Sequence, residues 1–155
     1  LGLKLTHTID THIHADHLSG AKRLKSLAGS TICYPAMDEL QCADMGLQEG
    51  VPLKLGSLEI HPLFTPGHTN HHHAYLINTP VTSRLFTGDA MLIDGVGRTD
   101  FQSGDSATLY KTIQQKFFTL PDDTLVHPGH DYEGRWVSSI AQEKARNEHI
   151  GGGKT

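Results

Sequence analysis

Apolar and polar residues alternate over residues 3–9, at the beginning of the chain. A period of two residues is typical of a strand that buries one face. The pattern therefore predicts a strand that runs directly into Thr11 and His12, so that His12 stands at a strand end.

Strand and helix patterns then follow each other along the chain. Ser19 can cap a short helix that ends at Gly29, and Asp105 or Ser106 can cap a longer one that stops before Pro121. Strands are predicted at residues 31–34, 53–55, 58–60, 74–77, 84–87 and 124–126, and a last helix at residues 137–147. Strands that alternate with helices predict an α/β layered fold.

The composition is that of a soluble globular protein. Hydrophobic residues make up 37% and charged residues 19% of the 155 residues, and no apolar run approaches the roughly 18 residues of a membrane span. A formal net charge of −4 provides no attraction for nucleic acid. The two cysteines, Cys33 and Cys42, favour a reducing compartment. We therefore expect one domain over residues 1–155, located in the cytoplasm, with no nucleic-acid or membrane partner.

Histidine is unusually frequent, with 12 copies in the chain. Neutral imidazole is the commonest metal ligand in proteins. Four potential ligands lie in one short segment, and a strand would send the first two to one face while the following turn brings back the others. These residues are His12, His14, Asp16 and His17.

Three later potential ligands also follow the end of a predicted strand. His68 follows Pro-Gly after one strand, Asp89 follows Gly88 after another, and His130 follows Pro-Gly after a third. Sites of α/β folds gather where loops meet at one edge of the sheet. A common metal centre is therefore predicted.

The spacing leaves the number of metal ions open. Two cations could be held, one by His12, His14 and His68, the other by Asp16, His17 and His130, with Asp89 between them. A single Fe(II) bound by two histidines and one carboxylate would also fit, and so would paired Zn(II) that activates water.

Two further motifs are predicted to have no such role. His71, His72 and His73 are expected to form an exposed run, because consecutive residues of an extended chain point in opposite directions. The sequence Gly-Gly-Gly-Lys-Thr at residues 151–155 lacks the earlier glycine and the preceding strand of a phosphate-binding loop.

The segment at residues 11–17, Thr-His-Ile-His-Ala-Asp-His, resembles the metallo-β-lactamase superfamily. The stretches at residues 86–93 and 97–102, together with Thr-Leu-Pro at 119–121 and His-Asp-Tyr at 130–132, resemble the persulfide dioxygenase (ETHE1-like) family. The resemblance covers nearly the whole chain. It implies an αββα sandwich that lacks part of its N-terminal β-layer, since only residues 1–11 precede the histidine motif, and a domain shortened at both ends.

The resemblance also implies an activity. One non-haem Fe(II) per chain would be bound at His12, His68 and Asp89, with glutathione persulfide and O2 as substrates and sulfite and glutathione as products. Four residues would lie around these ligands or hold a second metal: His14, Asp16, His17 and His130. Arg98 and Tyr132 would contact the substrate, although Arg98 could equally pair with Asp100 or Asp131. A homodimer is compatible with the family, as is the mitochondrial matrix if the source is eukaryotic.

Two other functions stay open on the sequence. A hydroxyacylglutathione hydrolase of the glyoxalase II type shares the histidine cluster and would use two Zn(II) ions per chain, whereas the stretch from Gly97 to Phe101 favours the dioxygenase. A fragment that binds metal without catalysis is the third interpretation.

Overall fold

A computed structural model describes residues 2–154 and contains two β-sheets. The first sheet is parallel and consists of β1 (His7–Ile9), β2 (Thr31–Pro35) and β3 (Met45–Leu47). The second sheet is mixed and consists, in spatial order, of β4 (Leu53–Leu55), β5 (Leu58–Phe64), β6 (His73–Ile77), β7 (Arg84–Gly88), β8 (Leu125–Pro128) and β9 (Ser138–Ser139).

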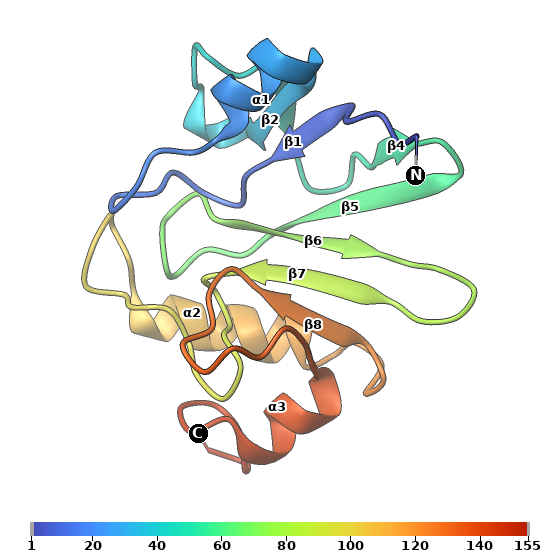
Figure 1. Ribbon diagram of the computed structural model, residues 1–155. Coiled ribbons are helices and arrows are strands. Elements are labelled where there is room, and N and C mark those ends of the chain that lie inside the picture. The colour runs from blue at the N-terminus through green and yellow to red at the C-terminus, as the bar shows by residue number, and fades with distance from the viewer. Residues whose placement is uncertain (1, 155) are drawn as a thin grey trace.

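Helices cover the outer faces of the two sheets (Figure 1). Helix α1 (Ala21–Ala28) lies over the first sheet, and the 3-10 turn η1 (Ala36–Asp38) follows β2. The second sheet is covered by α2 (Ser106–Thr112), the π-helical turn η2 (Ile113–Phe117) that continues it, and α3 (Ile140–Arg146). The order of layers is helix, sheet, sheet, helix, which confirms the predicted αββα sandwich.

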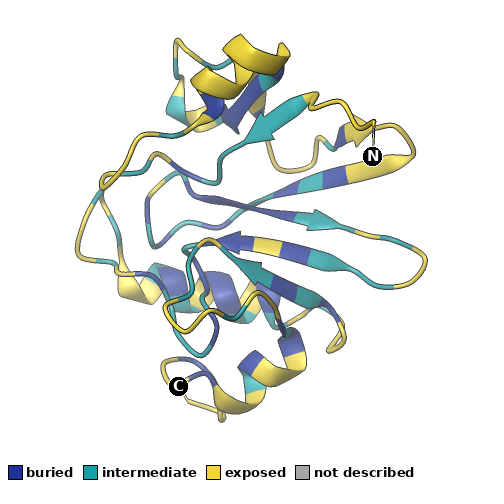
Figure 2. Ribbon diagram, viewed as in Figure 1, coloured by how far each residue is buried: buried dark blue, intermediate teal, exposed yellow. Residues whose placement is uncertain are grey.

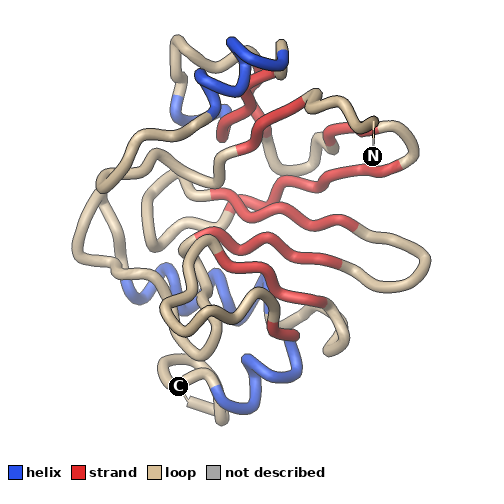
Figure 3. Tube along the Cα trace, in the orientation of Figure 1, coloured by secondary structure: helices blue, strands red, loops and turns tan. Residues whose placement is uncertain are grey.

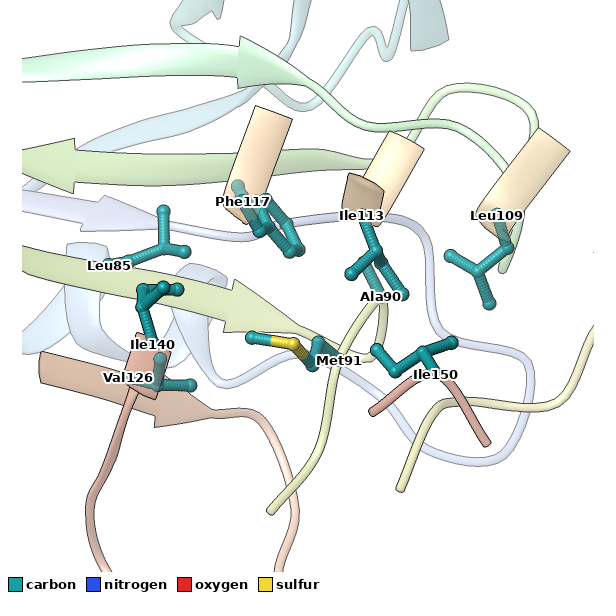
Figure 4. Close-up of a cluster of buried hydrophobic side chains, with 10 residues drawn as sticks. Leu85, Ala90, Met91, Leu109, Ile113, Phe117, Val126, Ile140 and Ile150 are labelled. Carbon is teal, nitrogen blue, oxygen red and sulfur yellow. The ribbon is translucent and has the colours of Figure 1, made fainter. Parts of the chain in front are cut away.

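Buried residues, dark blue in Figure 2, lie on the strands of both sheets and on the helices, and the apolar ones among them form the clusters between the layers. Cys33 and Leu47 of the first sheet meet Leu53, Ile60 and Tyr75 of the second. Beneath the second sheet, strand residues such as Leu85 and Val126 pack against Leu109, Ile113 and Phe117 from α2 and η2 and against Ile140 from α3 (Figure 4). The four-residue spacing of Leu109, Ile113 and Phe117 thus buries one face of a helix, as predicted.

Most predicted elements are confirmed, with shifted ends. Asp105 caps α2, since its carboxylate accepts a hydrogen bond from the Thr108 backbone N–H at 2.7 Å. Gly29 ends α1 in the left-handed conformation, with φ of 69°. Ser19 stands one residue before the helix cap and accepts a hydrogen bond from the Ala21 N–H at 3.2 Å.

Three elements differ from the predictions. Strand β1 begins only at His7, because its pairing with β2 starts at the register His7–Thr31. The predicted last helix starts at Ile140, because Ser138 and Ser139 first pair with β8. Strand β3 was not predicted.

The prediction that His71, His72 and His73 form an exposed run was wrong. His72 is completely buried and His73 is 2% exposed. Strand β6 begins at His73, and both of its faces are covered, since Ala74 packs into the core beneath the second sheet and Tyr75 into the core between the sheets. Alternating side chains therefore point into protein on either side. Only His71 is partly exposed, and its ring contacts Asp38 at 3.0 Å.

Both cysteines lie within the described residues and are free thiols, Cys33 buried and Cys42 exposed. No helix between residues 2 and 154 has the length and apolar character needed to cross a membrane.

Candidate metal centre

Four strands, β1, β5, β7 and β8, end on the same side of the sandwich (Figure 1), where long loops gather (Figure 3). Each of these strands is followed by a loop that carries potential metal ligands. Strands β5, β7 and β8 run in one direction, since β6 is antiparallel to β5 and β7 while β8 is parallel to β7. Their loops bring His68, Asp89 and His130 to one edge of the second sheet. Strand β1 of the first sheet supplies the loop with His12. The prediction that these strand ends converge is therefore confirmed.

The carboxylate of Asp89 lies at the centre of this cluster. Its Oδ2 atom is 3.3 Å from His130 Nε2, 3.6 Å from His68 Nε2 and 4.0 Å from His12 Nε2. The donor atoms of His12, His68 and Asp89 all lie within 4.8 Å of one another. Three imidazoles thus turn the same nitrogen toward one carboxylate oxygen.

The surroundings of Asp89 fit a bound cation. Its other oxygen, Oδ1, is buried and has no hydrogen-bond partner within residues 2–154. A buried carboxylate without a cation or sufficient donors is costly. Nitrogen and oxygen ligands in this combination suit Fe(II) or Zn(II). The donor set is therefore that of a metal site.

His12 is buried and neutral, which is the state that a ligand requires. Burial, followed by the charges of His14 and His68, lowers the pKa of His12 to about 3. His12 therefore provides no positive charge for Asp89 at neutral pH. Its Nδ1 atom is 2.9 Å from Thr11 Oγ1, so the ring is held by the residue before it while Nε2 faces the cluster.

The backbone fixes the orientation of His68. Its Nδ1 atom donates a hydrogen bond to the carbonyl oxygen of Arg98 at 2.7 Å. Because a carbonyl can only accept, the proton of a neutral His68 lies on Nδ1 and leaves the Nε2 lone pair directed at the cluster. Gly97 makes this approach feasible, since a Cβ there would lie 2.0 Å from the Asp89 carbonyl oxygen and 2.9 Å from His68 Nδ1.

A second, more exposed group contains His14, Asp16 and His17, whose donor atoms also lie within 4.8 Å of one another. His17 Nδ1 contacts Asp16 Oδ1 at 3.0 Å. The Asp10 carboxylate, 3.8 Å away, raises the pKa of His14. His14 lies between the two groups, since its ring centroid is 4.3 Å from that of His12 and 4.1 Å from that of His17.

A cavity of about 530 Å³ opens beside the cluster. Its walls include His12, His68 and Asp89, and also Arg98, Phe101 and Tyr132. Arg98 donates two hydrogen bonds to Asp100, at 2.7 and 2.9 Å, and lies 5.9 Å from the centre of the Phe101 ring. Of the two partners considered for Arg98, Asp100 is the one that it contacts.

The carboxylate of Asp131 is instead bound to Arg135, through both Nε and one terminal nitrogen. Tyr132 is exposed, and its ring is parallel to that of His130 with centroids 6.4 Å apart. The sequence placed both Arg98 and Tyr132 near the substrate, and both line the cavity.

Some residues that shape the cluster were not predicted. Asp10 receives hydrogen bonds on its carboxylate from Ser19 at 2.8 Å and on its carbonyl from Tyr75 at 2.9 Å, which anchors the loop before His12. His72 stacks against His12, with ring centroids 5.0 Å apart. Burial, followed by the charges of His12 and His68, holds the pKa of His72 well below its usual value.

Comparisons with known proteins agree with this architecture. Residues 1–130 match the family model described as the metallo-beta-lactamase superfamily. The chain is 40% identical over 152 residues to the persulfide dioxygenase ETHE1, mitochondrial, of Homo sapiens, which covers 97% of this chain and 58% of that protein. It is 35% identical over 146 residues to a hydroxyacylglutathione hydrolase of Polaromonas sp., covering 92% of this chain and 55% of that protein.

Among solved structures, that of ETHE1 from Myxococcus xanthus is 43% identical and has a TM-score of 0.90, covering 99% of this chain and 66% of that one. The chain spans 58% of the length of its human relative, so it corresponds to a part of that protein. The αββα layers, the cluster at the strand ends and the match over residues 1–130 lead to one assignment: the chain belongs to the metallo-β-lactamase superfamily, in which it is similar to the persulfide dioxygenases.

Proposed function

We propose that the protein is an iron-dependent persulfide dioxygenase that oxidises glutathione persulfide to sulfite and glutathione. The observation that carries the proposal is the set His12, His68 and Asp89, two imidazole nitrogens and one carboxylate oxygen that line one wall of an open cavity. Two histidines and one carboxylate on one face are typical of non-haem Fe(II) oxygenases. The names of the human relative and of the Myxococcus structure support the same activity.

In this proposal, His12, His68 and Asp89 hold one Fe(II) per chain. When bound, the iron would supply open coordination positions for the persulfide sulfur and for O2. The Asp89 carboxylate would neutralise part of its charge, and the Nε2 lone pairs of His12 and His68 would complete the three protein ligands. His14, Asp16, His17 and His130 surround the ligands, and His130 approaches Asp89 Oδ2 at 3.3 Å, where it can orient the carboxylate.

The overall reaction balances without a separate reductant. Glutathione persulfide, O2 and one water give glutathione, sulfite and two protons. The S–S bond breaks, and the terminal sulfur loses the four electrons that O2 gains. The protein's part is to bring the terminal sulfur and O2 together in the correct orientation, which is a major contribution to catalysis.

The cavity also offers contacts for the rest of the substrate. Glutathione has two carboxylates, and Arg98 is the cation on the cavity wall that can bind one of them. Its pairing with Asp100 orients the guanidinium without burying it, since both side chains are exposed. Phe101 and Tyr132 add aromatic surface at the same mouth.

A glutathione thioester hydrolase is the second candidate, and one observation favours it. His14, Asp16 and His17 form a further group of donor atoms that could hold a second metal ion. A hydroxyacylglutathione hydrolase is also among the relatives. With two Zn(II) ions, an activated water would cleave a thioester in the absence of O2.

Metal content and oxygen consumption distinguish the two candidates. After anaerobic purification, we expect about one iron per chain, since one set of mixed nitrogen and oxygen ligands suits a single Fe(II). In an oxygen electrode, glutathione persulfide should cause O2 uptake with sulfite formation, and S-lactoylglutathione should cause none. Two zinc ions per chain, with thioester cleavage in air and under argon alike, would reject the dioxygenase in favour of the hydrolase.

A further inference from the structure

His72 is a completely buried imidazole that the proposed reaction does not use. It lies directly behind the metal cluster, stacked on His12 with ring centroids 5.0 Å apart and an interplanar angle of 28°. Its edge also faces the His68 ring, with centroids 6.1 Å apart. The other two histidines of the run point elsewhere: His71 contacts Asp38, and His73 Nδ1 contacts the His71 carbonyl at 2.9 Å.

One nitrogen of His72 is satisfied and the other is not. Nδ1 is 2.8 Å from the hydroxyl of Thr65, which is also fully buried. Nε2 is buried and has no hydrogen-bond partner within residues 2–154. Buried polar atoms without a partner are rare and require an explanation.

The unpartnered nitrogen and the Thr11 hydroxyl border the same point of the backbone. A Cβ added at Gly88 would lie 2.7 Å from His72 Nε2 and 2.6 Å from Thr11 Oγ1. Thr11 Oγ1 is in turn 2.9 Å from His12 Nδ1. The Thr11 hydroxyl and His72 Nε2 therefore lie on either side of the space that a side chain at Gly88 would fill.

The hydrogen bonds of His12, Thr11, His72 and Thr65 can all be donated in the same direction, from His12 toward Thr65. If His12 Nε2 binds a metal, the proton of His12 lies on Nδ1 and is donated to Thr11 Oγ1. The Thr11 hydroxyl proton then needs an acceptor, and the nearby His72 Nε2 has a lone pair when its own proton lies on Nδ1. His72 Nδ1 donates to Thr65, whose hydroxyl donates to the His72 carbonyl at 3.4 Å.

We propose that His72 is a positioning residue for the metal ligand His12. Its ring supports the His12 ring from behind. Its unpartnered Nε2 is the acceptor toward which the Thr11 hydroxyl would turn once His12 binds a metal, and this would fix the His12 tautomer that leaves His12 Nε2 free for that metal. The inference rests on the proposed function only in that His12 binds a metal. It requires no turnover and no particular substrate.

The test measures Co(II) binding to the metal-free protein, followed through the Co(II) absorption spectrum. His72→Phe keeps a ring of similar size but removes both nitrogens, and Thr11→Val removes only the hydroxyl. Because partners that orient a metal ligand typically contribute 10- to 100-fold to affinity, each variant should bind Co(II) about 10-fold or more weakly, with a changed spectrum. The double variant should lose little more than either single variant, because both break the same chain of hydrogen bonds.

His73→Phe is the matched control, since His73 is a buried histidine of the same run that faces away from the cluster. It should bind Co(II) as the wild type does. Thermal unfolding of each metal-free variant shows whether it folds. If His72→Phe does not fold, Thr11→Val decides alone, because Thr11 lies in a partly exposed loop.

Co(II) affinity within about twofold of the wild type for folded His72→Phe or for Thr11→Val would overturn the inference. Full additivity of the two substitutions would overturn it as well. If the wild type binds no Co(II), the metal site of the proposed function fails together with it. If the wild type binds Co(II) and the variants bind it as tightly as the wild type, the positioning role of His72 is rejected while the metal site stands.

Discussion

Gly129 approaches Asp89 so closely that a Cβ at Gly129 would lie 2.6 Å from Asp89 Oδ1. Gly129→Ala should therefore push the carboxylate away from the histidines and weaken metal binding about 10-fold or more. Metal content after dialysis against a chelator would measure this. Gly20→Ala is the control, since a Cβ at Gly20 meets nothing within 4 Å and the backbone there is not left-handed. Equal metal retention by both variants would contradict the assignment of Asp89 as a ligand.

Alanine substitution of His12, His68 or Asp89 should abolish metal retention. Each removes one of the three donors that lie within 4.8 Å of one another, and the remaining two cannot complete a site. His71→Ala should retain the metal, because the His71 ring is directed at Asp38. Metal analysis of the purified variants checks this, and a loss in His71→Ala as large as in His68→Ala would show that the ligands have been chosen wrongly.

Arg98→Ala should raise the KM for glutathione persulfide about 10-fold while the bound iron stays constant. The reason is that a hydrogen bond to a charged group contributes about 1.5–3 kcal/mol to binding. Arg98 and Asp100 are both exposed, so folding should be unaffected. Steady-state kinetics and circular dichroism would be recorded together. Loss of the folded spectrum, with no separate change in KM, would identify Arg98 as structural.

Glu143 should be the most sensitive residue of α3. Its carboxylate is fully buried and accepts hydrogen bonds from the Asp94 backbone N–H at 2.9 Å, from Asn147 Nδ2 at 2.8 Å and from Ser138 Oγ. Glu143→Ala leaves the Asp94 N–H without its acceptor and removes one of two acceptors from Ser138 and Asn147, so it should lower the free energy of unfolding by about 3 kcal/mol.

Urea denaturation would measure the effect of Glu143→Ala. Exposed Glu148, near the end of α3, provides the control, and Glu148→Ala should change stability by less than about 0.5 kcal/mol. Similar midpoints for the two variants would show that the buried network contributes little.

The metal-free protein should lose stability in acid through His12. Its pKa is lowered from 6.5 in the unfolded chain to about 3 in the folded one. Below pH 6.5 the unfolded state therefore binds a proton that the folded state does not, so stability falls as the pH drops from 6.5 toward 3. His12→Gln should show a shallower decline in thermal midpoint over this range. Identical slopes for both proteins would mean that His12 is accessible in the metal-free state.

The sequence was sufficient for the parts of the site that depend on strand ends. The apolar strand before Gly88 and Asp89, and the Pro-Gly turns before His68 and His130, are local patterns with local consequences. Because three of these strands run in one direction in the same sheet, the ligands meet without further information.

The rest depends on contacts between distant segments. His72 precedes β6, where its backbone carbonyl accepts a hydrogen bond from Thr65 and its ring stacks on His12, and nothing in the run of three histidines indicates that position. Strand β3 is three residues long with Gly46 in its middle, so it has no recognisable pattern, and its pairing with β2 creates it. The partner of Arg98 is a local exception, since Arg98 pairs with Asp100 two residues away and Arg135 pairs with Asp131 four residues away.

The two sheets contribute to the cluster unequally: β1 supplies His12, and the second sheet supplies His68, Asp89 and His130. Both cysteines are free, so no disulfide joins the layers. A metal bound to ligands from both sheets would act as a cross-link, closing long loops that otherwise cost entropy and stabilising the native state in proportion to its affinity. The amount of protein that survives proteolysis would then follow the supply of metal. A cell deprived of that metal would lose the polypeptide itself, and restoring the metal would recover activity only as fast as new chains are made.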